Sequence, residues 1–197
     1  QDVMAARQTG FAMLATSSVQ EVMDLAGVAH IVALKARVPF VHFFDGFRTS
    51  HEIQKVEMMD AASLTAMFDR EALAAFRNRA LNPEHPVSRG TAQNPDIYFQ
   101  TREASNKFYD AVPEMVAEAM EQISTITGRE YKPFVYYGAE DADRVVIAMG
   151  SVTETLKETA DYLNARGEKV GVVTVHLYRP FSAKYLFNVL PKSAKNI

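Results

Sequence analysis

The stretch "RVVIAMGSVTETLKETADYLNARGEKVGVVTVHLY", residues 144–178, predicts a βαβ unit. Residues 144–150 are predicted to form a strand, residues 151–167 a helix, and residues 168–178 a second strand. A helix that joins two strands of one parallel sheet is expected to cross over with a right-handed turn. The stretch therefore predicts an α/β fold with a parallel sheet.

The chain before this unit also alternates strands with helices. Residues 11–16 form a short apolar run suited to a buried strand. Residues 38–44 are apolar apart from His42, a pattern typical of a parallel strand that is covered on both faces. Between these strands we predict a helix that begins with a capping box, because Glu21 follows Ser18 by three positions. The apolar face of this helix would consist of Val22, Leu25, Val28, Ala29, Val32, Ala33 and Ala36.

Further helices are predicted downstream, with a long loop among them. Asp60 and Asp69 are typical N-cap residues and would start two short helices. Pro113 near a first turn and Gly128 after a last turn bracket another helix. Residues 82–103 contain three prolines and no clear periodicity, so they are predicted to form a loop. Ordered loops of that length usually wrap a partner or approach a site.

The residue pattern changes around residues 128–143, and we place a domain boundary there. The parts of the chain before and after this stretch are predicted to belong to different domains. The second domain would continue past the βαβ unit into a helix that starts near residue 182.

The composition sets limits on the class of protein. The chain has 197 residues, of which 48% are hydrophobic, so it can bury a packed core. A net charge of −3 with 23% charged residues predicts neither a nucleic-acid partner nor a membrane partner. The apolar runs are short and no signal peptide opens the chain, so a cytoplasmic location is expected. With no cysteine, the chain alone holds no disulfide, thiol nucleophile, iron–sulfur cluster or thiolate metal site.

The loop after the predicted strand 38–44 is the first candidate site. Six polar or charged side chains lie within eight residues there, and open α/β sheets bind ligands at the carboxyl ends of parallel strands. Arg48 and His51 are suited to bind an anionic group. His51 and Glu52 are suited to exchange protons.

A purely structural interpretation of the same loop stays open. Thr49 and Glu52 are spaced as a capping box, and Asp45 with Gly46 is a pair suited to a tight turn. From residue chemistry alone, a structural or interface role is favoured over direct catalysis.

Two other places carry candidate polar groups. Arg7 and Gln8 precede the first buried strand and would face a cofactor or serve only as turn and cap groups. Gly150 and Ser151 end a strand at a helix N-terminus, where backbone N–H groups can hold a phosphate. Ser151 and Glu154 are also spaced as a capping box, and no glycine-rich phosphate-binding motif is present.

Several strings of the sequence resemble one enzyme family. They are "DVMAARQTGFAMLA", "FFDGFRTSHEIQKVE", "RGTAQNPDIYFQ", "REASNKFYDAVP" and "LYRPFSA". Together they resemble the pyruvate:ferredoxin (flavodoxin) oxidoreductases of anaerobic and facultative bacteria, and the likeness runs from end to end of the chain. The resemblance implies large multidomain homodimers that oxidatively decarboxylate pyruvate to acetyl-CoA and CO2. It also implies thiamine diphosphate, Mg2+ and [4Fe-4S] clusters as cofactors, coenzyme A as co-substrate, and ferredoxin or flavodoxin as electron acceptor.

For this chain the resemblance implies a partial structure. Residues 1–130 would be the later half of the domain that covers the pyrimidine end of thiamine diphosphate. Residues 134–197 would be the start of a transketolase-C-terminal-like domain. The family's substrate-contacting and cofactor-activating residues would lie upstream of Gln1, so no catalytic residue and no metal ligand is assigned. The chain alone is expected to hold no cofactor and to be inactive.

The resemblance also assigns a role to the candidate residues. Because the matching loops lie near the cofactor cleft and the neighbouring domains, we expect them to support the cofactor-facing domain and its interface. Arg48 in particular is expected to brace the carboxylates of Asp45 and Glu52. The alternative is a free-standing α/β module that binds a protein partner or a small anion. The residues with this supporting role are Arg7, Gln8, Asp45, Arg48, Thr49, His51 and Glu52.

Overall fold

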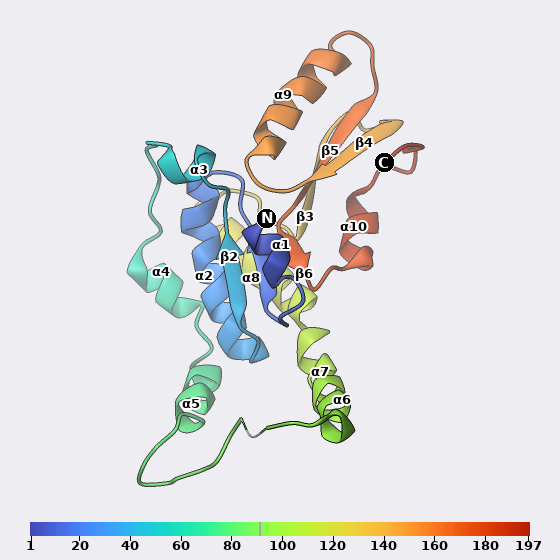
Figure 1. The fold of residues 1–197 in the computed structure, drawn as a ribbon. Helices are drawn as coiled ribbons and strands as arrows, with labels where there is room; N and C mark the ends of the chain where they lie inside the picture. Colours follow the sequence, from blue (N-terminus) through green and yellow to red (C-terminus); the bar gives the residue numbers. More distant parts are fainter. Residues whose placement is uncertain (91) are drawn as a thin grey trace.

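The computed structural model describes residues 1–90 and 92–197 (Figure 1). In these residues the strands form two three-stranded sheets, with the orders β2-β1-β6 and β3-β5-β4. The strands are β1 (Ala12–Ala15), β2 (Phe40–Phe43), β3 (Phe134–Gly138), β4 (Arg144–Ala148), β5 (Val170–Val175) and β6 (Leu177–Arg179). The helices are α1 (Asp2–Ala6), α2 (Val19–Ala36), α3 (Arg48–His51), α4 (Ala61–Ala66), α5 (Arg70–Asn78), α6 (Pro95–Ala104), α7 (Asn106–Tyr109), α8 (Val112–Thr127), α9 (Val152–Asn164) and α10 (Ala183–Val189).

The first sheet is centred on β1, which is fully buried. β1 and β2 run parallel and are joined by α2, as the sequence predicted. Helices α2 and α8 pack together over this sheet, because apolar side chains on each of them enter the same core as those of β1. That core includes Ala12, Leu14, Leu25, Val28, Val32, Val112, Val116, Met120 and Ile123.

The burial predicted for residues 38–44 is wrong in one respect. In the described sheet β2 is an edge strand with β1 as its neighbour, and each of its four residues is only half-buried. An apolar run therefore predicts a strand that can be buried on both faces. It does not show that other residues of this chain bury it.

The second sheet confirms the βαβ unit. β4 and β5 are parallel neighbours joined by α9, and β3 pairs with β5 in the antiparallel direction. Every residue of β5 is buried because α9 and α10 lie on opposite faces of this sheet (Figure 1). Val173 and Val175 share a core with Leu186 of α10, which confirms the helix predicted near residue 182.

The single strand predicted for residues 168–178 is wrong, because it divides at His176. β5 ends just before this residue, and β6 begins just after it in the other sheet. The backbone N–H groups of His176 and Leu177 both donate to the carbonyl of Pro133, at 3.0 and 3.1 Å, which turns the chain. β6 then pairs antiparallel with β1, so the last part of the chain completes the first sheet.

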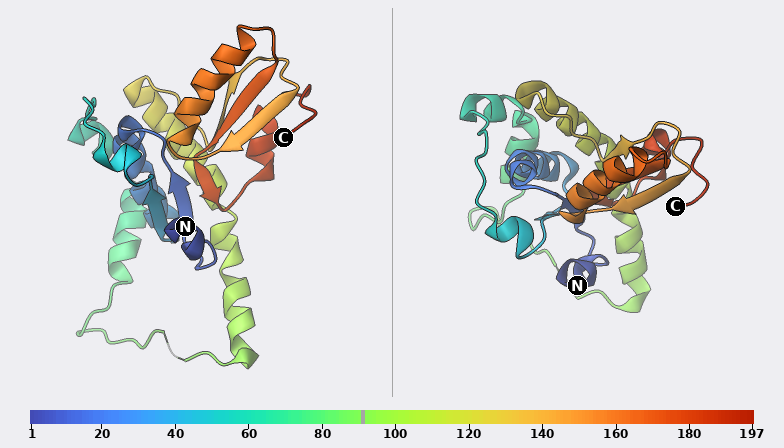
Figure 2. Two further views of the ribbon diagram at one scale, coloured as in Figure 1. Left: turned by 45° about the horizontal axis from the view of Figure 1, so that its top comes forward. Right: turned by 90° about the horizontal axis from the view of Figure 1, so that it is seen from above.

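The prediction of a long loop for residues 82–103 is wrong for the second half of that range. Helix α6 (Pro95–Ala104) occupies its second part and begins at Pro95, a position where the missing N–H of proline costs no hydrogen bond. Helices α5 and α6 extend away from the two sheets (Figure 2). Between them the chain is exposed and has no helix or strand in its described part, and residue 91 lies outside the described residues.

The helix ends follow the local signals well. Ser18 accepts a hydrogen bond from the Glu21 N–H at 3.2 Å, and Asp60 and Asp69 cap α4 and α5. Gly128 ends α8 in the left-handed conformation, with φ 71°. No helix in the described part of the chain is long and apolar enough to cross a bilayer.

Candidate functional site

The carboxyl ends of β1 and β2 lie beside the first turn of α9. Ser17 follows β1, Asp45 and Thr49 follow β2, and Ser151 and Thr153 start α9. Hydrogen bonds join Asp45 to Thr49 and Ser151, and a separate one joins Ser17 to Thr153; we call these five residues the strand-end junction. The junction joins the two sheets at the edge where open α/β sheets hold their ligands.

Asp45 is the centre of the strand-end junction. Its carboxylate accepts hydrogen bonds from the backbone N–H and the hydroxyl of Ser151, both at 2.7 Å, and from the Thr49 hydroxyl at 3.4 Å. Gly150 adopts φ 81°, a conformation that favours glycine, and so turns the Ser151 N–H toward Asp45. Partial burial works to raise the pKa of Asp45, but the hydrogen bonds from Ser151 outweigh burial and hold the pKa below its ordinary value.

This contact replaces the capping box predicted for Ser151 and Glu154. Ser151 makes no side-chain cap on its own helix, and Glu154 pairs with Lys157 at 2.7 Å instead. The anion at the N-terminus of α9 is therefore the chain's own Asp45 carboxylate. A carboxylate is favourable there because the helix dipole places partial positive charge at that end.

Two buried hydroxyl groups extend the strand-end junction. Thr153 Oγ1 and Ser17 Oγ form a hydrogen bond at 2.9 Å, Thr153 Oγ1 also lies 2.9 Å from the Gly150 carbonyl, and both residues are almost completely shielded from solvent. A buried hydroxyl without a partner would cost free energy, so this pair fixes the approach of α9 to the end of β1.

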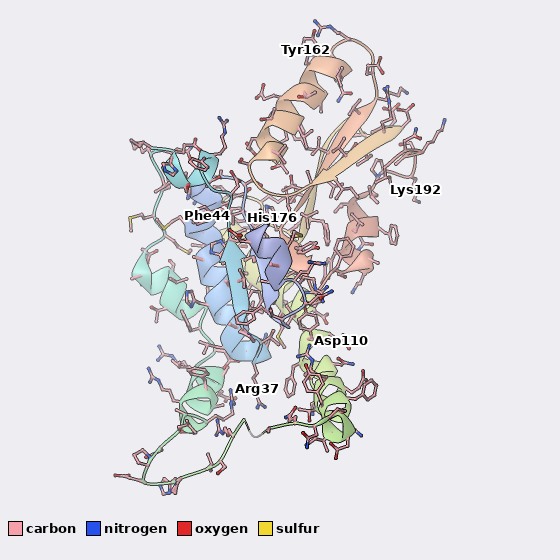
Figure 3. All side chains as sticks on the ribbon, in the orientation of Figure 1. Arg37, Phe44, Asp110, Tyr162, His176 and Lys192 are labelled. Carbon is pink, nitrogen blue, oxygen red and sulfur yellow. The ribbon has the colours of Figure 1, made fainter. Side chains whose placement is uncertain are left out.

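A buried histidine lies next to the strand-end junction. His176, labelled in Figure 3, has Nδ1 at 2.7 Å from the Lys132 carbonyl and Nε2 at 3.5 Å from Glu21 Oε1. A carbonyl only accepts hydrogen bonds, so Nδ1 carries a proton. Burial works to raise the pKa of Glu21, but His176 and the Ser17 N–H hold it below its ordinary value.

A second polar cluster ties α2 to the segment between α8 and β3. Asp24 is fully buried and accepts hydrogen bonds from the Tyr131 hydroxyl at 2.7 Å and from Arg129 Nε at 2.8 Å. Arg129 also reaches Glu57 at 2.7 Å. Burial, followed by the nearby Asp24 carboxylate, raises the pKa of Tyr131 well above its usual range.

Sequence reasoning missed this cluster, although one signal pointed to it. Asp24 lies beside Leu25 on the helical face that was predicted to be apolar. A charge at such a position requires a partner, but the partner is 105 positions away and is not recognisable from its own surroundings.

The remaining residues of the loop after β2 are exposed and do not join the strand-end junction. Helix α3 begins at Arg48, and Ser50 Oγ accepts from the Phe47 N–H at 2.9 Å, so the capping box predicted for Thr49 and Glu52 is wrong. Thr49 is buried because its hydroxyl points back to Asp45. Among the described residues, His51 contacts the Ser50 hydroxyl at 2.8 Å, while Glu52 contacts Gln54 at 3.4 Å.

The expected brace of Arg48 is also wrong in the part of the chain that the structure describes. The Arg48 side chain has no hydrogen bond and no ion pair there, and Asp45 is satisfied by Ser151 and Thr49 instead. The physical reason is that a backbone N–H and two hydroxyls reach the carboxylate without ordering a long exposed side chain.

Arg7 and Gln8 lie away from the strand-end junction. The Arg7 guanidinium donates to the Met4 carbonyl within the first turn of the chain. Gln8 lines a cavity at the amino end of β1, which is the opposite end from Asp45. The structure therefore does not bring the two candidate regions together.

The strand-end junction does not fit the diphosphate end of a cofactor. Its one carboxylate already has three hydrogen-bond partners. The described residues contain no group of three or more His, Cys, Asp or Glu side chains placed to hold a metal ion. What this arrangement does chemically is to lock the two sheets together with fully paired polar groups.

Two protein-family models match this chain. A model described as "Pyruvate flavodoxin/ferredoxin oxidoreductase, thiamine diP-bdg" matches residues 1–121, and one described as "Pyruvate:ferredoxin oxidoreductase core domain II" matches residues 142–197. Asp45 lies in the first matched range and Ser151 in the second. The strand-end junction thus joins the two matched ranges.

The sequences of curated relatives are similar to this chain over its whole length. It is 68% identical to a pyruvate-flavodoxin oxidoreductase from Enterobacter agglomerans and 62% identical to a pyruvate:ferredoxin oxidoreductase from Moorella thermoacetica. All of this chain is covered, but it spans only 17% of the length of each relative. A solved 2-oxoglutarate:ferredoxin oxidoreductase from Magnetococcus marinus matches 90% of this chain and 32% of its own, at 16% identity and a TM-score of 0.48. The identities and the family models show that the chain belongs to the pyruvate flavodoxin/ferredoxin oxidoreductase family.

Proposed function

We propose that the chain is the segment of a pyruvate:ferredoxin or pyruvate:flavodoxin oxidoreductase in which the thiamine-diphosphate-binding domain meets core domain II. Residues 1–130 would be the later part of the first domain and residues 134–197 the start of the second. The support comes from the two matched family models and from relatives that are about six times longer.

The whole protein would oxidise pyruvate and coenzyme A to acetyl-CoA and CO2. Two electrons would leave through [4Fe-4S] clusters to ferredoxin or flavodoxin, in a cytoplasmic homodimer. Thiamine diphosphate, bound with Mg2+, would supply the carbanion-stabilising chemistry. This chain contains no cysteine and its described residues hold no cluster of carboxylate or histidine side chains suited to a metal ion, so the cluster ligands and the diphosphate site would come from other parts of the protein.

The chain's own part would be to position the cofactor-facing domain. Asp45 and Thr49 would hold the loop after β2 against α9, and the exposed Arg48, His51 and Glu52 would face the neighbouring domains. Arg7 and Gln8 would contribute from the other end of β1. The observation that carries this proposal is the pair of hydrogen bonds between Asp45 and Ser151, which link the two matched ranges.

An anaerobic assay of viologen reduction tests the proposal. The full-length protein that contains this chain should reduce methyl viologen only when both pyruvate and coenzyme A are present. The purified 197-residue chain should show no turnover, and it should bind thiamine diphosphate more weakly than about 10 μM, roughly −7 kcal/mol. Turnover by the chain alone, or a natural gene product with an intact mass near 22.0 kDa, would refute the segment assignment.

A further inference from the structure

A cavity of about 300 Å3 opens at the amino ends of β1 and β2, opposite the strand-end junction. Its walls come from the segment before β1, the end of α2, the α6–α7 region and β6. Figure 3 labels Arg37 at the end of α2 that lies toward α5 and α6. The cavity volume is at the lower end of the range for small-molecule sites.

The charged side chains that line this cavity are all positive. Arg37, Arg102 and Arg179 line it, and none of its lining residues is an Asp or a Glu. Within the described part of the chain, none of these three guanidinium groups has an ion pair with a carboxylate. Three neighbouring cations without a counter-charge repel one another, so the cavity favours an anion.

The backbone and the aromatic side chains hold these arginines in place. Arg37 is a non-glycine residue with φ 59°, a conformation that costs free energy, and its guanidinium lies 4.9 Å from the centre of the Phe108 ring. Arg179 Nε donates to the Tyr109 hydroxyl at 3.3 Å.

Gly10 leaves the space that the third arginine uses. A Cβ built on Gly10 would lie 3.2 Å from Arg102 Nη1 and 3.5 Å from Nη2. A side chain at this position would crowd the guanidinium, so the glycine lets the backbone before β1 lie close to Arg102.

We propose that this cavity binds a small phosphate-bearing anion. Planar guanidinium groups bind phosphate oxygens through paired hydrogen bonds, and a phosphate dianion balances more than one arginine. Ser105 and Asn106 add neutral polar groups to the wall, and Phe11 and Pro39 add apolar surface for a small organic part. The inference does not depend on the proposed redox activity, because the arginines lie at the other end of the sheet from the strand-end junction.

Titration of the full-length protein with inorganic phosphate tests this inference, at constant ionic strength maintained with chloride. Binding should saturate, and Arg37→Gly should weaken it at least ten-fold. Glycine accepts the left-handed conformation of residue 37 without strain, so this variant should keep its melting temperature. Arg102→Gln should weaken phosphate binding by a similar factor and serves as the second variant.

Arg70→Gln is the matched control, because it removes the same charge from an exposed residue outside the cavity. Its phosphate affinity should stay within two-fold of the unmodified protein. If the control loses as much phosphate affinity as the cavity variants, the effect comes from the net charge of the protein and the inference is overturned. It is also overturned if phosphate fails to saturate, if acetate binds as tightly as phosphate, or if the cavity variants change only subunit assembly.

Discussion

The Asp45 carboxylate holds both the backbone N–H and the hydroxyl of Ser151 at 2.7 Å, across 106 positions of sequence. One side chain therefore caps a helix that belongs to the other sheet. A cap from within the same helix stabilises that helix alone, whereas this one also fixes the relative position of the two sheets. The stability of the helix and the assembly of the sheets are coupled through a single carboxylate.

Asp45→Asn should lower the free energy of unfolding by about 2 kcal/mol. The amide keeps one acceptor oxygen, but it loses the charge and presents an NH2 group to a donor. Chemical denaturation of the variant and the unmodified chain measures the difference. Asp69→Asn is the matched control, because Asp69 caps α5 locally and asparagine caps helices equally well. An equal loss in both variants would contradict the linking role of Asp45.

The contacts of Asp45 in the strand-end junction and of the neighbouring Glu21 should weaken in acid. The folded pKa values of Asp45 and Glu21 lie below their ordinary values of 3.8 and 4.5. The unfolded chain therefore binds more protons than the folded chain in this range, so stability is complete above about pH 5 and falls as the pH drops through the folded pKa values. Unfolding measured between about pH 5 and pH 3 should have a smaller pH dependence in the double variant Asp45→Asn, Glu21→Gln. An unchanged pH dependence would show that other carboxylates control it.

Arg129→Gln should destabilise the chain by about 3 kcal/mol, because it leaves the fully buried carboxylate of Asp24 without its cation. Glu57→Gln removes the other, largely exposed carboxylate partner of Arg129 and should cost less than about 0.5 kcal/mol. Denaturant midpoints of the two variants provide the measurement. Similar costs for both variants would mean that Asp24 does not depend on its ion pair.

Arg48→Lys should change the free energy of unfolding by less than about 0.5 kcal/mol, because the Arg48 side chain is exposed and contacts no carboxylate in the described residues. In the full-length protein, the affinity for thiamine diphosphate and the apparent KM for pyruvate separate the roles that remain. A higher KM with normal cofactor affinity would place Arg48 near the substrate. A larger change in the free energy of unfolding would support the pairing of Arg48 with Asp45 and Glu52, which the structure does not contain.

Local signals predicted several elements and helix starts correctly. The strand lengths and the helix between them identified β4, α9 and β5, and Asp60 and Asp69 marked the starts of two short helices. Two of the errors were local, since Ser50 rather than Glu52 caps α3 and α6 formed in a predicted loop, and others arose where a distant partner overrode a local pattern. Ser151 had the spacing of a capping box but is bonded to Asp45, and the strand after α9 changes sheet at His176, which is neither glycine nor proline.

The candidate site was predictable in outline only. The position of a polar loop after a parallel strand identified Asp45, and the helix start identified Ser151, but no rule based on spacing pairs residues that lie so far apart. Asp24 and Arg129 illustrate the same limit: the position of Asp24 on an apolar helical face requires a partner, but nothing near Arg129 in the sequence identifies it as that partner.

The pairing of β1 with β6 has a consequence for synthesis of the chain. Met13 and Leu14 meet their partners in residues 177–179, so this edge of β1 lacks its partner until those residues have left the ribosome. Until then β1, a strand of four apolar residues, has one open edge that another nascent chain can pair with. Of the six described strands, β6 comes last in the sequence, and it is the strand that covers this edge of β1.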